Sequence, residues 1–415
     1  MIIPDGRELP KSDQMKLTKE EQSIYDGEQG EVLQKAMEIL VALGKIYDAE
    51  ELVPIRSVQI AGVSYKNLGE AGIEYLEWWV EHNANVQAFS TLNPAGIDLG
   101  RWKELGFKED FSKNQHHIVD LYEKMGIVPT CTCTPYEIGN LPKFGDHLGW
   151  SESSAVSFAN SYIGARTNRE GGPSALAAAL VGKTPCYGYH LDDVRKANAV
   201  FNVSADISSD ADFGALGVLA GRETKKGVPY FKGLPAMRTF NFKQLGASMA
   251  ASGSVALYHV HGQSPESRAG DMIAEDHEEF DIEGLDEAYE YLNTGGDDVD
   301  FVSMGCPHAS MEEIMIIANM LKGRKVRSPL WITTSQATSC QATAYGYKDI
   351  IEGTGAKLIS DTCMVVSPIE DFGYDTVATN SAKGCYYMQS WCNVRTRYGS
   401  MRQCIDAALT GRWQK

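Results

Sequence analysis

The sequence TCTCTPY, residues 130–136, decides how this chain is interpreted, because two cysteines follow directly on a short apolar strand predicted at residues 127–129. Two further polar stretches come soon after it, WSESSA at residues 150–155 and GARTNREGGPS at residues 164–174. Together the three stretches offer thiolates, a carboxylate beside hydroxyl groups, and two arginines next to a flexible glycine pair. This combination is typical of a site that holds a metal and an anionic substrate.

The same order of strand, polar loop and helix repeats on both sides of these stretches. Such a repeat favours α/β layers in which most strands run parallel. A helix is predicted at residues 337–351, and the acidic residues 265–300 predict a solvated surface region. The other predicted strands cover residues 57–61, 86–90, 255–261, 300–304, 330–334 and 357–360.

Composition places the chain among ordinary globular proteins. Its 415 residues are 43% hydrophobic and 22% charged, and this length predicts roughly two or three packed units. The net charge of −17, without a basic stripe, argues against a nucleic-acid partner. No segment approaches the roughly 20 apolar residues that span a bilayer, and no signal peptide is recognisable. We therefore expect a cytoplasmic protein whose nine cysteines are reduced or bind a metal.

Three of the predicted strands end on cysteine: one at Cys131 and Cys133, one at Cys306 and one at Cys363. Ligand sites of open parallel sheets lie outside the carboxyl ends of the strands, so these thiols could converge. Three thiolates are the right number for a [4Fe–4S] cluster with one iron left open. The spacing alone is equally compatible with three small buried apolar side chains, a common role of free cysteine.

Histidine offers a different metal site. His259 and His261 alternate on one predicted strand and therefore face the same side. With Cys306 they could bind zinc, which would make the protein a zinc hydrolase. Ordinary polar packing of the two histidines is the simpler interpretation.

Seven motifs spread along the chain resemble one family. The chain is similar to the large subunits of the aconitase X family in QIAGVSY (59–65), CTCTPY (131–136), WSESSA (150–155), residues 164–173, GCPH (305–308), DTC (361–363) and NSAK (380–383). The resemblance implies an aconitase-like catalytic core of several three-layer α/β/α units with mostly parallel sheets, lacking the swivelling domain. We expect a helical lead-in over residues 1–50, a substrate and first cluster-ligand region over 51–290, and a region supplying the remaining cysteines over 291–415.

The resemblance also implies which residues form the site. It assigns a [4Fe–4S] cluster to Cys133, Cys306 and Cys363, with Cys131 as an alternative to Cys133. Glu152 and Ser153 are the implied catalytic residues, although Glu152 could instead be a carboxylate that stabilises a helix start. The implied substrate contacts are Gly62, Val63, Ser64, Asn93, Pro94, Glu152, Ser153 and Ser381. Candidate anion holders are Arg166, Arg169 and Lys383, for which structural ion pairs are the alternative.

The reaction implied by the resemblance is the removal of water from a small hydroxy acid. The expected substrate is (R)-mevalonate 5-phosphate, which would give trans-anhydromevalonate 5-phosphate in the mevalonate pathway of isoprenoid synthesis. The alternative substrate within the family is cis-3-hydroxy-L-proline, and a non-enzymatic scaffold with buried thiols is the alternative outside it. Residues 384–415 do not suggest the swivelling domain, so we expect a separate small subunit that carries it, together with a catalytic serine.

Overall fold

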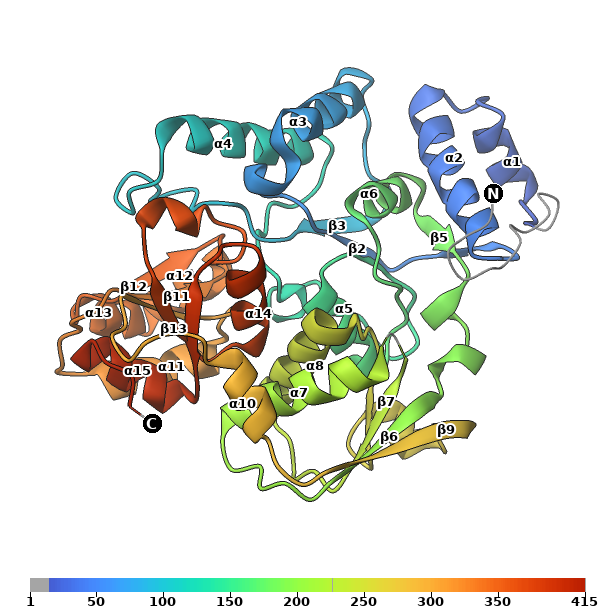
Figure 1. Ribbon diagram of the computed structural model, residues 1–415. Helices are drawn as coiled ribbons and strands as arrows, with labels where there is room; N and C mark the ends of the chain where they lie inside the picture. Colours follow the sequence, from blue (N-terminus) through green and yellow to red (C-terminus); the bar gives the residue numbers. More distant parts are fainter. Residues whose placement is uncertain (1–14, 226, 415) are drawn as a thin grey trace.

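The computed structural model describes residues 15–225 and 227–414, and these residues form three parallel sheets that follow one another along the sequence (Figure 1). The strand orders are β3-β2-β4, β8-β7-β6-β9 and β12-β11-β10-β13-β14. A short antiparallel pair, β1 (Leu52–Pro54) and β5 (Lys183–Pro185), accompanies the first sheet. The predicted α/β architecture with mostly parallel sheets is confirmed.

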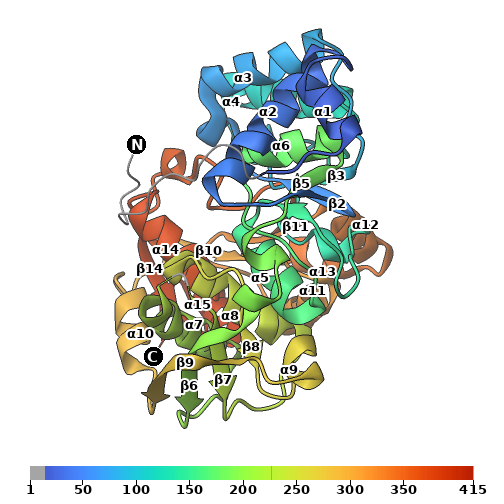
Figure 2. The same ribbon diagram turned by 90° about the vertical axis from the view of Figure 1, so that its right-hand side faces the viewer.

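The first sheet is built around β2 (Ser57–Ile60), which is buried along its whole length. It pairs on one side with β3 (Phe89–Leu92) and on the other with β4 (Gly149–Trp150). In Figure 2 the helices of this unit gather above the sheet, and the rest of the chain lies below it. These helices are α1 (Lys19–Tyr25), α2 (Glu31–Ile46), α3 (Tyr65–Glu81), α4 (Glu109–Lys124) and α6 (Gly172–Val181).

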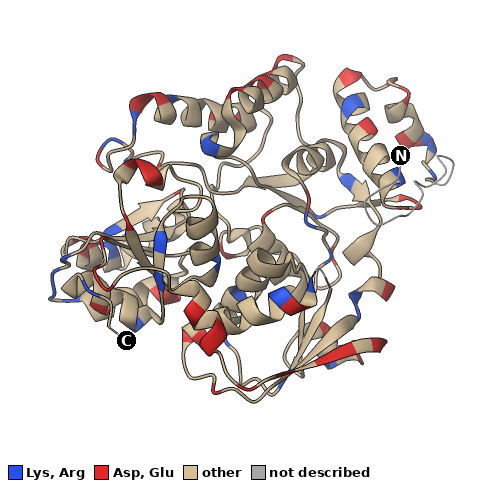
Figure 3. Ribbon diagram, viewed as in Figure 1, with Lys and Arg blue, Asp and Glu red and all other residues tan. Residues whose placement is uncertain are grey.

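The second sheet is centred on β6 (Ala197–Val203) and β7 (Pro229–Lys232). The strand predicted at residues 255–261 is shorter than expected, because only β8 (His259–Val260) pairs with β7. The acidic region also contains a strand that the sequence did not predict, β9 (Ile273–Ile282), whose carboxylates line an exposed edge (Figure 3). The helices here are α7 (Asp210–Thr224), α8 (Thr239–Gly253), α9 (Pro265–Ala269) and α10 (Asp286–Leu292).

The third sheet has apolar cores on both faces. The single helix predicted at residues 337–351 is wrong, because Gly346 at φ +76° separates α12 (Gln336–Ala344) from α13 (Tyr347–Glu352). The strands are β10 (Phe301–Met304), β11 (Leu330–Thr334), β12 (Lys357–Ser360), β13 (Thr376–Thr379) and β14 (Arg395–Tyr398). The other helices are α11 (Met311–Leu321), α14 (Ala382–Ser390) and α15 (Met401–Thr410).

The three units meet around the residues that follow their strands. Helix α5 (Ser153–Phe158), which follows β4, and helix α14 of the third unit contribute to the same apolar core as α8 of the second unit. Between the first and third units, the Ala95 N–H donates to the Asp361 carbonyl at 2.7 Å. This contact joins the loops that follow β3 and β12, and so brings the carboxyl ends of the two sheets together.

The predicted regions 51–290 and 291–415 carry the first two sheets and the third sheet, respectively. Of the predicted lead-in, residues 1–14 lie outside the described residues. Whether these boundaries delimit independently folding units stays a prediction. No helix in residues 15–225 and 227–414 combines the length and apolar character that a membrane span requires.

Candidate active site

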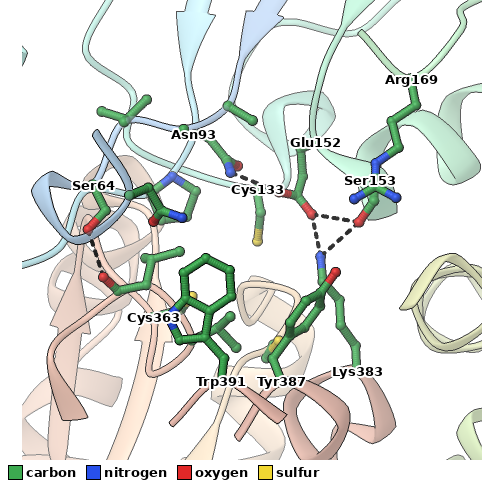
Figure 4. Close-up of a pocket in the computed structure, with 18 residues that line it drawn as sticks. Ser64, Asn93, Cys133, Glu152, Ser153, Arg169, Cys363, Lys383, Tyr387 and Trp391 are labelled. Carbon is green, nitrogen blue, oxygen red and sulfur yellow. Dashed lines mark hydrogen bonds and ion pairs between the residues drawn. The ribbon is translucent and has the colours of Figure 1, made fainter. Parts of the chain in front are cut away.

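A pocket with a cavity volume of about 210 Å³ lies where strands of the first and third sheets end (Figure 4). This is where parallel α/β sheets place ligands. The pocket brings together all but one of the predicted cluster ligands, catalytic residues and substrate contacts: Gly62, Val63, Ser64, Asn93, Pro94, Cys133, Glu152, Ser153, Cys306 and Cys363. The exception is Ser381, which is fully buried and caps α14 by accepting the Gly384 N–H at 2.8 Å.

The three cysteines reach the pocket from separate loops. Cys133 lies in the loop that runs alongside the end of β3, Cys306 follows β10, and Cys363 follows β12. Cys131 does not line the pocket; it is fully buried in the core of the first unit. Of the two neighbouring cysteines, only Cys133 therefore faces the other two thiols across the pocket.

These thiols have the chemistry of ligands for an iron–sulfur cluster. Burial raises the pKa of each, and charge on Cys306 adds to the rise at Cys363, whose pKa reaches about 12. Ionising all three thiols therefore requires a strongly positive partner, since metal binding displaces thiol protons. No three His, Cys, Asp or Glu side chains of the described residues are arranged around a single metal-ion position. Three soft donors around an open cavity fit an iron–sulfur cluster.

Glu152 is held in the pocket by a dense set of donors. As N-cap of α5 it accepts the Ser154 N–H at 3.3 Å. Its Oε1 pairs with Lys383 Nζ of the third unit, and its Oε2 accepts from Asn93 Nδ2 at 2.8 Å. Burial alone would raise the pKa of Glu152, but the Lys383 charge and these hydrogen bonds lower it to about 2. Glu152 is therefore a carboxylate at neutral pH.

Ser153 completes this part of the pocket. Its hydroxyl lies 3.3 Å from Glu152 Oε1 and 3.3 Å from Lys383 Nζ. Lys383 was one of the candidate anion holders, but it is committed to Glu152 and the neighbouring serines. Ser154 Oγ also lies 3.2 Å from Lys383 Nζ. The Lys383 ammonium group therefore contacts one carboxylate and two hydroxyl groups.

Gln59 was not predicted as a site residue, although it contacts two of them, Glu152 and Asn93. It is fully buried in β2, where its Oε1 accepts the Glu152 N–H at 3.0 Å. Its Nε2 donates to Asn93 Oδ1 at 3.1 Å and to the Thr132 carbonyl at 3.3 Å. The available signal was an uncharged polar residue inside the apolar strand SVQI, because a buried amide needs several partners.

The two candidate arginines have different surroundings. Arg169 lines the pocket near Ser153 (Figure 4), and no ion pair joins it to a carboxylate of the described residues. Arg166 lies outside the pocket, where it pairs with Asp192 and donates to the His190 carbonyl at 2.9 Å. Arg169 is therefore the arginine with a charge available to an anionic ligand.

The zinc interpretation is wrong. The buried His259 ring bonds through Nε2 to the Arg195 carbonyl at 2.8 Å, and His261 Nδ1 lies 2.8 Å from the Tyr230 hydroxyl. Cys306 belongs to the pocket described above, where neither histidine is a lining residue. The described residues hold no group of three such side chains arranged for a single metal ion.

Family comparisons agree with this geometry. Models of the first, second and third domains of aconitase X match residues 14–193, 197–290 and 299–410. The chain therefore belongs to the aconitase X family. The crystal structure of Thermococcus kodakaraensis aconitase X in its holo-form is similar, with a TM-score of 0.89 and 50% identity, covering 95% of this chain and 100% of that one.

Two curated relatives carry names that describe an activity. The phosphomevalonate dehydratase large subunit of Methanocaldococcus jannaschii is 48% identical over 94% of this chain and 99% of its own length. The cis-3-hydroxy-L-proline dehydratase of Pseudomonas aeruginosa is 32% identical over 94% of this chain and 70% of its own length.

Proposed function

We propose that this chain is the large subunit of a dehydratase that converts (R)-mevalonate 5-phosphate into trans-anhydromevalonate 5-phosphate. The observation that carries the proposal is the convergence of three cysteines with Glu152 and Arg169 in one pocket. The similarity to phosphomevalonate dehydratase large subunits, close to half of all positions, supports this substrate. The similarity to cis-3-hydroxy-L-proline dehydratases is lower, although it supports the same type of reaction.

We infer that Cys133, Cys306 and Cys363 hold a [4Fe–4S] cluster. Their position in one pocket supports this assignment, and the position of Cys131 in the core supports Cys133 as the first ligand. Three protein ligands leave one iron open. When bound, the cluster supplies a Lewis acid for the hydroxyl group that leaves as water.

Glu152 and Ser153 orient the reacting part of the substrate in this proposal. Because the pKa of Glu152 is about 2, its carboxylate accepts a hydrogen bond at neutral pH and does not act as a proton donor. Ser153 Oγ offers a second hydrogen-bonding group beside it. Lys383 keeps both oriented, and Ser381 supports Lys383 by capping the helix that carries it.

The remaining pocket residues suit the anionic groups of the substrate. Gly62, Val63 and Ser64 lie between β2 and α3, and their backbone N–H groups donate to no carbonyl of the described residues. Unpaired N–H groups at a helix start attract anions. Arg169 adds a full positive charge and can pair with two oxygens at once. Asn93 and Pro94 complete the wall next to these groups.

We infer that a small subunit completes the enzyme. The name "large subunit" of the relatives supports such a partner. In this proposal the small subunit carries the swivelling domain, and one of its serines takes the proton from the carbon next to the leaving hydroxyl. The carbon–oxygen and carbon–hydrogen bonds then break and a carbon–carbon double bond forms. The abstracted proton and the leaving hydroxide together make up the water that is released.

The direct test is anaerobic reconstitution of both subunits with iron and sulfide. We expect water loss from (R)-mevalonate 5-phosphate, followed by mass spectrometry, and little or no turnover of cis-3-hydroxy-L-proline. Cys306→Ala should abolish both the cluster and the reaction. Cys404→Ala is the matched control, because Cys404 is also buried but lies outside the pocket. Full cluster content and activity in Cys306→Ala would refute the proposal.

A further inference from the structure

We propose that His308 is a positioning residue that fixes the three cysteine loops relative to one another, a role that rests on the proposed cluster site. His308 is fully buried two positions after Cys306, and it does not line the pocket. It therefore has no access to a substrate bound there. Its contacts are instead with the backbone and side chains of the loops that present the cysteines.

The imidazole ring of His308 bridges the two loops that belong to the other cysteines. Its Nδ1 lies 2.8 Å from the hydroxyl of Thr132, the residue between Cys131 and Cys133. Its Nε2 lies 3.0 Å from the carbonyl oxygen of Thr362, the residue before Cys363. The ring thus ties the first and third cysteine loops to the second loop, on which it is carried.

The backbone of His308 adds a direct contact with a cysteine. Its N–H donates to Cys133 Sγ at 3.2 Å. Hydrogen bonds to cysteine sulfur are one of the means by which a protein tunes an iron–sulfur cluster. By holding the loop in place, the His308 side chain therefore fixes the position of the backbone N–H that donates to Cys133.

The partners of the ring define its protonation. A carbonyl oxygen only accepts hydrogen bonds, so Nε2 carries the proton that is donated to Thr362. Nδ1 of the neutral ring is then an acceptor, and it receives the hydroxyl proton of Thr132. The Thr132 oxygen in turn accepts the Thr134 N–H at 3.2 Å. In this series of hydrogen bonds each donor has one acceptor, so the hydrogen bonds fix the orientation of the imidazole ring.

The second unit of the chain also contacts His308. Lys243 of α8 donates to the His308 carbonyl at 2.9 Å and pairs with Glu313 of α11. Glu313 also accepts from the Ser310 N–H at 3.0 Å. Although no residue of the second sheet lines the pocket, this unit contacts the cysteine loops through Lys243. His308 is consequently a point at which residues of all three units meet next to the proposed cluster site.

The test compares His308→Leu with the parent chain in complex with its small subunit. Loss of a residue that orients metal ligands typically costs about 10- to 100-fold in metal affinity. We therefore expect iron to be lost to a chelator about 10 to 100 times faster, with an altered electron paramagnetic resonance spectrum of the reduced cluster. In the metal-free chain we expect faster alkylation of Cys133, Cys306 and Cys363, measured by mass spectrometry.

Three further variants separate positioning from a general loss of stability. His259→Leu is the matched control, because His259 is equally buried and also binds one backbone carbonyl, but it lies away from the cysteine loops. Thr132→Val removes only the hydroxyl that reaches His308, and Thr132→Ser restores it. We expect Thr132→Val to resemble His308→Leu, and Thr132→Ser and His259→Leu to resemble the parent in cluster retention and alkylation.

The outcomes distinguish this inference from the proposed function. If the parent takes up a cluster and His308→Leu and Thr132→Val match His259→Leu in iron loss, spectrum and alkylation, the role of His308 is refuted. If the parent takes up no cluster, the proposed function fails. Alkylation of the metal-free chain then still decides whether His308 holds the three loops.

Discussion

Two buried lysine–glutamate pairs stand on either side of the cysteine loops, and only one faces the pocket. Lys383 and Glu152 have side-chain exposures of 9% and 12%, and Lys243 and Glu313 have 2% and 6%. Each pair joins the third unit to another unit of the chain. The same two residue types therefore serve both as part of the candidate active site and as an internal support.

The surroundings of each pair explain the difference. The pocket at Lys383 and Glu152 also holds Arg169, so two cations face one carboxylate. A second cavity of about 340 Å³ touches Lys243 and Glu313, but there one lysine faces three glutamates, including Glu137. An anionic substrate is attracted to the first cavity and repelled by the second. A buried ion pair therefore indicates function only when an accessible cavity of suitable charge lies beside it.

The largest effect should come from neutralising the pair that faces the pocket. Glu152→Gln keeps the shape but removes the charge that orients Lys383 and Ser153. We expect kcat to fall about 10²- to 10³-fold, the range typical of removing one preorganised electrostatic group from an active site. Steady-state kinetics of the reconstituted enzyme checks this. Glu170→Gln, the same change at a buried carboxylate outside the pocket, should leave kcat within about twofold.

A comparable change in the internal pair should affect stability. Lys243→Met leaves Glu313 as an uncompensated buried charge, which typically costs about 3 to 5 kcal/mol. We expect a loss of this size in the free energy of unfolding of the metal-free chain, measured by urea denaturation. Lys357→Met removes an exposed pair with Glu104 and should cost less than about 1 kcal/mol. Equal losses in the two variants would contradict the internal role of Lys243.

The smallest effect is expected from a variant that tests the charge difference between the two cavities. Arg169→Gln removes the cation of the pocket that is not paired with Glu152. A charge-assisted hydrogen bond contributes about 1.5 to 3 kcal/mol, so KM should rise roughly 10- to 100-fold with less change in kcat. Arg166→Gln, made in the same loop but outside the pocket, should leave KM within about twofold. An unchanged KM in Arg169→Gln would remove this arginine from substrate binding.

Local patterns in the sequence identified much of the fold and most of the pocket. Strands that end in Cys306 and Cys363 predicted where those thiols lie, because parallel strands present their carboxyl ends to one side. The acidic strand β9 was missed because its residues are largely exposed and lack the apolar alternation that marks a half-buried strand. The break at Gly346 was missed because a single glycine inside a helical stretch is often tolerated.

Contacts between distant residues could not be predicted in the same way. Glu152 and Lys383 are 231 positions apart, and each alone resembles an ordinary charged residue near a helix start. Gln59 is also informative only through its partners, since a buried polar side chain is defined by the groups that satisfy it. The docking of three sheets decides these partnerships, and no local periodicity encodes it.

The same separation along the chain sets an order of events during synthesis. Ribosomes add about 5 to 20 residues per second, so roughly 10 to 50 seconds pass between the appearance of Glu152 and that of Lys383. Cys133 emerges before this interval, whereas Cys306 and Cys363 emerge within it. A nascent chain therefore presents a single thiol of the trio for most of this interval. Loading of a metal group that needs all three thiols becomes a late, post-docking step, after the last sheet has left the ribosome.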